Sequence, residues 1–220
     1  MSEPAGDGSL RAADGRMPGR RGLATRQRLL DCTTEMLKTT SYRDVKVIDI
    51  AREAGTSPAT FYQYFPDVEA AILVLAEQMA EDGAKLTALV LGSSWKGKAG
   101  YAVALGLADG FLEFWEEHRA VMRVVDLVTE EGDPRFRQIR VRVLNEVTTA
   151  LAEVFESFKL DHRHPADADP LATAGVIVSM LAHVAAHRYG FEFWGIRTGN
   201  LRDSMARLVY WGITGQKPPT

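Results

Sequence analysis

The segment from residue 47 to residue 65 carries the side chains best suited to surface chemistry, and it reads VIDIAREAGTSPATFYQYF. Its second half is rich in hydrogen-bonding groups, namely Ser57, Thr60, Tyr62, Gln63 and Tyr64. Glutamine can pair with an adenine edge, a threonine methyl can contact the thymine methyl, and tyrosine hydroxyls commonly reach phosphates. The set predicts a helix that reads DNA. Tyr62 is the better surface candidate, whereas Tyr64 could equally be a core residue.

Such side chains need two short helices that hold them outward, and this segment has the residues for a helix-turn-helix. Ala51 is small where the second helix must approach the first, Gly55 permits a turn with positive φ, and Phe61 can fill the gap. Ser57 and Pro58 suit the N-cap and the first position of the second helix. The alternative is two amphipathic helices joined by a capped turn inside a helical bundle.

Charge is distributed unevenly along the chain, whose formal net charge is −3. Between residues 11 and 28 there are six arginines, at 11, 16, 20, 21, 26 and 28, and one acid, Asp14, which gives 6 − 1 = +5. Residues 1–22 hold four of these six arginines, five glycines and few large apolar groups, so we expect a disordered basic arm. A basic end on an acidic body fits a polyanion partner, and it also fits a solvated tail.

Elsewhere the sequence gives weak signals for catalysis or metal binding. His183 and His187 have the spacing of a metal pair, but Val184 stands where a zinc hydrolase needs a glutamate, so we favour pocket or core histidines. The acidic stretch 161–169 lacks the central glycine and final glutamate of a calcium loop. Cys32 is the only cysteine, which excludes internal disulfides and cysteine-based zinc sites. We expect no catalytic residues, no metal and no cofactor.

The body of the chain is apolar and aromatic enough to line a cavity between helices. The candidate pocket residues are Phe111, Phe114, Trp115, Met122, Met180, His183 and His187. At helical spacing such residues are more often core, so a pocket and a packed core both remain open. A pocket of this composition would suit an apolar small molecule with one or two polar atoms.

The apolar periodicity is helical throughout, and no segment alternates with a period of two, so we predict an all-α protein of about nine helices. The expected helices cover residues 24–39, 47–54, 58–64, 68–91, 99–117, 119–131, 134–158, 168–189 and 200–213. Ile48 and Ile50 are expected on the buried side of the second helix. No run is apolar for the ~20 residues of a bilayer span, so we expect a cytoplasmic protein with no membrane partner.

Residues 24–75 resemble the DNA-binding end of TetR-family (TetR/AcrR-type) transcriptional regulators. The features that carry the resemblance are Tyr42 after the first helix, IAREAG at 50–55, SPATFYQYF at 57–65, and Glu69 at the start of a long helix. The resemblance implies a helix-turn-helix DNA-binding domain at 23–67 and a larger ligand-binding and dimerisation domain at 68–220. It implies a homodimeric repressor that binds an inverted-repeat operator in double-stranded DNA and is released by an apolar effector.

Three positions depart from the family pattern. Val68 replaces a phosphate-contacting lysine, Lys46 replaces a capping threonine or serine, and Ser41 replaces a glycine. Lys46 is then expected to reach a phosphate, and Arg26, with its neighbouring arginines, is expected to offset the lost lysine.

The last two expected helices are candidates for the dimer interface. The residues in question are Leu171, Gly175, Val178, Ala182, Leu208 and Trp211. The first four step by four, three and four residues, a stripe narrow enough for close helix approach. The alternative is that this stripe packs inside one chain. A different class of function also stays open, a helical-bundle enzyme or lipid carrier that uses the apolar cavity or the His183/His187 pair.

Overall fold

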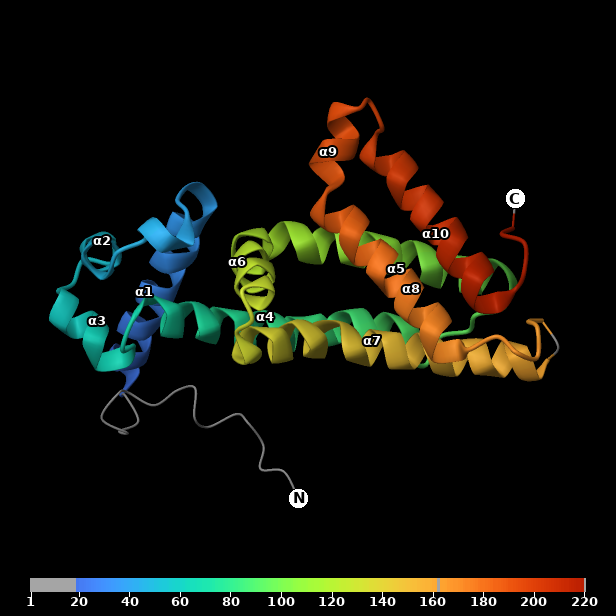
Figure 1. Ribbon diagram of the computed structural model, residues 1–220, viewed down its shortest axis with the longest axis horizontal. Coiled ribbons are helices and arrows are strands. Elements are labelled where there is room, and N and C mark those ends of the chain that lie inside the picture. Colours follow the sequence, from blue (N-terminus) through green and yellow to red (C-terminus); the bar gives the residue numbers. More distant parts are fainter. Residues whose placement is uncertain (1–18, 162, 220) are drawn as a thin grey trace, which may run out of the picture. The chain divides into compact units, whose positions relative to one another are not determined.

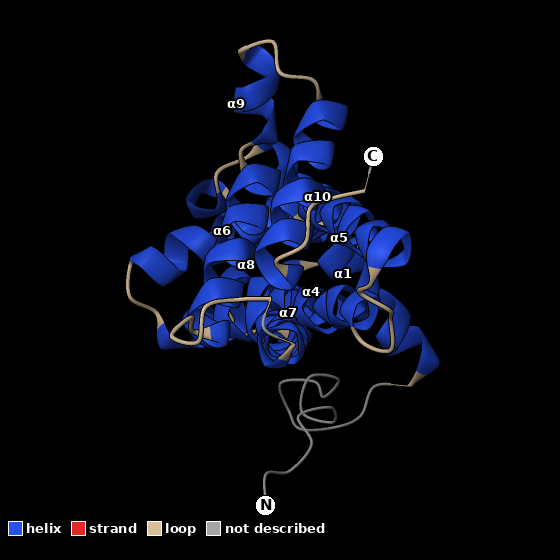
Figure 2. Ribbon diagram, turned by 90° about the vertical axis from the view of Figure 1, so that its right-hand side faces the viewer, coloured by secondary structure: helices blue, strands red, loops and turns tan. Residues whose placement is uncertain are grey.

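The computed structural model describes residues 19–161 and 163–219, and over these residues the chain is helical without strands (Figures 1 and 2). The all-α prediction is confirmed. The elements are α1 Arg20–Thr39, the 3₁₀ helix η2 Tyr42–Asp44, α2 Val47–Glu53, α3 Pro58–Tyr64, α4 Val68–Val90, α5 Gly97–Glu117, α6 Arg119–Glu130, α7 Pro134–Leu160, α8 Pro170–Ala186, α9 Arg188–Phe193 and α10 Thr198–Thr214.

Most helix ends lie within two residues of the sequence prediction, and two places differ more. Helix α1 begins at Arg20, so residues 20–22, expected in a disordered arm, are helical, because arginine is a good helix former and Gly19 takes an extended N-cap conformation. The rest of the expected arm, residues 1–18, lies outside the described residues. The helix expected over 168–189 divides at His187, which leaves helical geometry and separates α8 from α9.

Packing divides the described chain into two compact units, each built from two stretches of sequence. Unit 1 comprises residues 19–79 and 120–139, and unit 2 comprises residues 80–119 and 140–219. The long helices α4 and α7 each contribute to both units. The boundary at residue 67 between a DNA-binding domain and a ligand-binding domain stays a prediction. The division of the chain into two packing units is a different boundary.

The core of unit 1 forms where α1, α2 and α3 meet. Leu29 and Leu30 of α1, Ile50 of α2 and Phe61 of α3 have no exposed surface. Phe65, just after α3, is also buried. Burial of these five large apolar side chains fixes the orientation of α3, since a helix of seven residues is not stable alone.

The core of unit 2 forms where α10 packs against α5 and α8. Phe111 of α5 and Tyr210 of α10 are fully buried. Gly100, in the first turn of α5, lies against the preceding backbone, since a Cβ there would clash with the Trp95 carbonyl oxygen. No described helix combines the length and apolar character that crossing a membrane requires.

Candidate nucleic-acid interface

The α2–α3 turn has the geometry expected of a helix-turn-helix. Gly55 adopts a φ of 65°, and the Thr56 N–H donates to the Ala51 carbonyl over 2.8 Å. The Ser57 side chain caps α3 by accepting from the Thr60 N–H at 3.2 Å, and Pro58 occupies the first turn. Ala51 and Phe61 are fully buried. The predicted roles of these residues in the local fold are therefore confirmed.

The outward face of α3 presents two adjacent hydrogen-bonding side chains, Tyr62 and Gln63, and both are exposed. The Tyr62 ring packs edge-to-face on Phe61, with centroids 5.9 Å apart, and the residue is 52% exposed. The structure gives the other two candidates less freedom. The Thr60 hydroxyl lies 3.1 Å from Ser57 Oγ, and Tyr64 is half-buried beside Phe65.

The cationic candidates fare differently. Lys46 is exposed at the N-cap position of α2, makes no side-chain capping bond, and has no carboxylate partner among the described residues. Arg26, expected to contact phosphate, is only 4% exposed and lies over the Phe65 ring, 5.1 Å from its centroid. Burial lowers the pKa of Arg26. We therefore correct the prediction for Arg26, which is a packing residue and not a phosphate contact. Ile48, expected to be buried, is 59% exposed, because the buried side of α2 is formed by Ile50 and Ala51.

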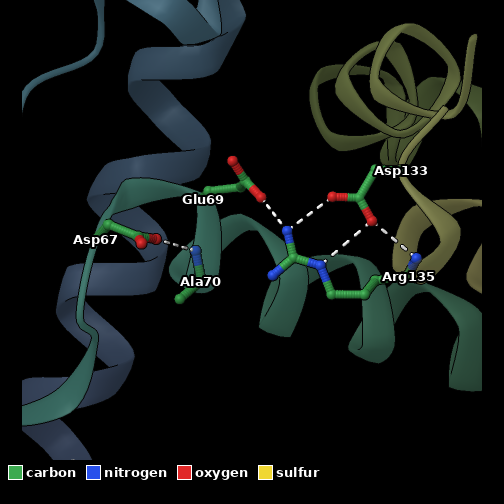
Figure 3. Close-up of polar contacts among 5 residues, drawn as sticks. All are labelled: Asp67, Glu69, Ala70, Asp133 and Arg135. Carbon is green, nitrogen blue, oxygen red and sulfur yellow. Dashed lines mark hydrogen bonds and ion pairs between the residues drawn. The ribbon is translucent and has the colours of Figure 1, made fainter. Parts of the chain in front are cut away.

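A polar junction ties the first helices to the turn between α6 and α7, and sequence reasoning missed it. In this junction, all within unit 1, Arg135 of α7 donates to Glu69 of α4 and to Asp133, over 2.7 Å in the latter case (Figure 3). Arg43 of η2 forms an ion pair with Glu131. These pairs join residues about 65 to 90 positions apart, and a spacing of that size leaves no periodic signal in a sequence.

Local caps fix the orientation of the junction. Asp67 accepts from the Ala70 N–H at 2.7 Å and so caps α4 (Figure 3). Asp133 accepts from the Arg135 N–H at 2.8 Å at the start of α7. The hydrogen bond from the Arg135 side chain holds the pKa of Asp133 below its usual range. The Asp133 carboxylate accepts two hydrogen bonds from the Arg135 side chain, which keep the guanidinium directed at Glu69.

The predicted pocket residues do not all lie in the interior. Phe111, Phe114 and Trp115 are buried on α5, where the Phe111 and Trp115 rings stack at 5.5 Å. Met122 is buried on α6 and Met180 is half-buried on α8. The two histidines require a correction, because both His183 and His187 are exposed. Their rings stack at 4.2 Å, and His187 Nδ1–H donates to the His183 carbonyl.

The predicted interface residues divide into two groups. Leu171, Leu208 and Trp211 are exposed, as an interface requires, and a Cβ on Gly175 would meet open space. Val178 and Ala182 are instead buried inside unit 2, Val178 at 1% exposure, so their assignment to an interface between chains is corrected. The reason is that α8 is apolar around most of its circumference, and its Val178 side faces the core formed with α5 and α10.

The surface of α10 also carries a hollow of about 710 Å³ that the sequence did not indicate. It is lined by Ser204, Arg207, Leu208, Trp211, Gly215 and Lys217. In the part of the chain that the structure describes, no three His, Cys, Asp or Glu side chains come together to hold a metal ion.

Comparison with known proteins identifies both halves of the chain. The family described as bacterial regulatory proteins, tetR family, matches residues 29–71, and the tetracyclin repressor-like C-terminal domain matches residues 86–220. An uncharacterized HTH-type transcriptional regulator of Haemophilus influenzae is 28% identical over 130 residues, which are 59% of this chain. The match spans 62% of that relative, less than two thirds of its length.

Solved structures share the fold at low identity. The fatty acid degradation regulator FadR of Bacillus halodurans is 16% identical with a TM-score of 0.65, over 90% of this chain and 98% of that one. FadR of Bacillus subtilis, solved in complex with stearoyl-CoA, is 15% identical with a TM-score of 0.63, over 85% and 98% of the two chains. The regulator MbdR of Azoarcus sp. CIB is 15% identical with a TM-score of 0.64, over 86% and 98%.

Proposed function

Since this chain belongs to the TetR family of transcriptional regulators, we propose that it is a repressor that binds an inverted-repeat operator as a homodimer and is released by a mostly apolar small molecule. It acts in the cytoplasm as a DNA-binding regulator and not as an enzyme. The observation that carries the proposal is the outward pair Tyr62 and Gln63 on α3, backed by the buried Phe61.

The chemistry of this pair suits a major groove. Gln63 has a donor and an acceptor in one plane, which is what the adenine edge requires, and Tyr62 offers a hydroxyl to a phosphate. Lys46, exposed at the start of α2, adds a cation whose contact with a phosphate would not depend on the base sequence. Two-fold symmetry then places the two copies of α3 about 34–36 Å apart on a palindromic site.

The effector class is inferred from the buried side chains of α5. Trp115 is buried, and its indole N–H has no hydrogen-bond partner among the described residues. A buried donor without an acceptor costs about 1–3 kcal/mol, so a ligand that offers an acceptor there would gain binding free energy. The rings of Phe111 and Phe114 lie against Trp115 and supply apolar surface. The Bacillus subtilis FadR complex with stearoyl-CoA supports an acyl compound as one candidate, and a polycyclic compound fits the same walls.

Release requires that the effector bind the DNA-free state more tightly than the DNA-bound state, commonly by ~1–3 kcal/mol. The polar junction is the physical route that we propose for this coupling. A displacement of the turn between α6 and α7 must either break the contacts of Arg135 with Glu69 and of Arg43 with Glu131 or move Glu69 and Arg43 with it. Both contacts end on elements next to the helix-turn-helix.

The test is fluorescence anisotropy of the full chain on labelled DNA from upstream of its own gene. Affinity is expected to fall linearly with the logarithm of salt concentration, by about 0.9 log units per neutralised phosphate. Scrambled DNA of the same length is the control, and it should bind far more weakly at the same salt. Equal affinity for both DNAs would contradict a specific operator function.

A further inference from the structure

Ile48 is a large apolar side chain of α2 that the fold leaves mostly uncovered. It is 59% exposed, whereas Ile50, two residues later, has no exposed surface. A branched aliphatic side chain offers water no hydrogen bond, and moving it from water into an apolar contact is favourable. Single apolar residues are common on protein surfaces, so the position of Ile48 within the helix-turn-helix decides whether its exposure serves a function.

Ile48 lies on the edge of α2 that borders α3. Successive side chains of an α-helix are about 100° apart, so Ile48 lies about 60° around the axis from Ala51 and about 160° from Ile50. Ala51 is the small, fully buried residue where α3 approaches α2, and its carbonyl accepts from the Thr56 N–H in the turn. The two helices pack against each other (Figure 1). Ile48 therefore lies beside α3, one turn before Ala51, and α3 does not cover it.

The start of α2 also carries the cation best placed for the DNA backbone. Lys46, two residues before Ile48, is exposed and makes no side-chain capping bond. A cation on a phosphate fixes the register of a helix on DNA without reading the sequence. The next cation along α2, Arg52, is instead held by Asp49 at 2.8 Å. We therefore expect the start of α2 to meet the backbone, which brings Ile48 to the edge of the groove that α3 enters.

The major groove offers one apolar target to an aliphatic side chain. The base edges there present hydrogen-bond donors and acceptors, and thymine alone adds an apolar group, its C5-methyl. The Ile48 side chain has neither a donor nor an acceptor, so it can discriminate between bases only through that methyl group. Contact with a deoxyribose would also cover Ile48, but it would carry no sequence information.

We propose that Ile48 packs against the C5-methyl group of one thymine in each half-site and so determines the base at that position. This inference rests on the operator binding of the proposed function, and it adds α2 to α3 as an element that reads bases. Burial of one methyl group strengthens binding about fourfold, so the two half-sites of a symmetric site together give about 15-fold.

The first experiment is a uracil scan of the operator by fluorescence anisotropy. Each thymine of a half-site, together with its symmetry mate, is replaced by uracil, which lacks the C5-methyl group and still pairs with adenine. The parent chain is expected to lose about 15-fold in affinity at the thymine pair that Ile48 contacts. The Thr60 methyl suits the same target, so a second experiment assigns the position to one residue.

The second experiment repeats the scan with Ile48→Ala. This variant should lose at least about 15-fold on the unmodified operator, and uracil at the contacted pair should cost it nothing further, because both changes remove the same contact. Ile48→Val keeps a branched side chain and should retain most of the affinity and the uracil effect. The matched control is Val141→Ala on α7, which removes an equally exposed branched side chain, 58% exposed, and should bind every operator like the parent.

Three results would overturn the inference. Parent-like affinity of Ile48→Ala for the operator is the first. The second is a loss in Ile48→Ala that is the same on every uracil-substituted operator, which would assign Ile48 to the sugar–phosphate backbone. The proposed function is tested separately, because a parent chain that binds operator and scrambled DNA equally contradicts it, and the inference with it, before any residue is replaced.

Discussion

Replacing Tyr62 by phenylalanine removes one hydroxyl and leaves the rest of the site in place. The hydroxyl bonds to no other described residue, and the ring keeps its edge-to-face contact with Phe61, so the fold should be unaffected. A hydrogen bond to phosphate exchanged for one to water contributes about 1 kcal/mol net. Because the proposed symmetric dimer carries two copies, the loss should be about 2 kcal/mol, or about 30-fold in affinity.

The assay is anisotropy on the operator at several salt concentrations, with Tyr101→Phe, a tyrosine that packs on Tyr210 in unit 2, as the matched control. Tyr62→Phe should weaken every DNA sequence by the same factor and leave the salt slope unchanged, since no charge is lost. Gln63→Ala should instead relax the preference at one base position in each half-site. Parent-like affinity in both variants would refute the placement of α3 in the groove.

Three further outcomes are expected from the rest of the structure. Arg135→Gln should lower the urea midpoint at low salt, because its exposed ion pairs are lost, and the difference should vanish near ~1 M salt. Burial lowers the pKa of His118 below 6.5, so the unfolded chain takes up a proton before the folded chain does. The free energy of unfolding therefore falls as the pH drops below 6.5. His118→Gln should flatten that fall in urea titrations between about pH 7.5 and 5.5. Gly100→Ala should destabilise the fold by about 1–3 kcal/mol, because its Cβ meets the Trp95 backbone. Gly106→Ala, in open space on the same helix, should stabilise it by about 0.5–1 kcal/mol in the same urea titrations. Equal effects of the two substitutions would contradict the close approach at Gly100.

The helix-turn-helix was predictable because its determinants are local. Gly55 needs a positive φ, Ser57 caps the helix that Pro58 begins, and Phe61 is the single large apolar residue placed to reach the core. Each requirement acts over a few residues, so spacing alone carried the information. The exposure of Tyr62 followed from its position next to Phe61 on a short helix.

The remaining features depend on partners far along the chain. Helix α8 is apolar on most sides, so its periodicity could not tell which stripe faces α5 and α10, and Val178 was placed on the wrong side. Arg26 looked like one of several surface arginines, but Phe65, 39 residues later, covers it. The contact between Arg135 and Glu69 joins two helices whose proximity is decided only by the tertiary fold.

The interleaving of the two units has a consequence for synthesis on the ribosome. Unit 1 needs residues 120–139, which emerge only after residues 80–119, the first stretch of unit 2. At about 5–20 residues per second, the nascent chain spends several seconds with α1, α2 and α3 translated and the second stretch of unit 1 still unmade. A transcript cut after residue 79 therefore encodes an unfinished unit, because Glu131 and Arg135, the ion-pair partners of Arg43 and Glu69, are made only in the second half of translation.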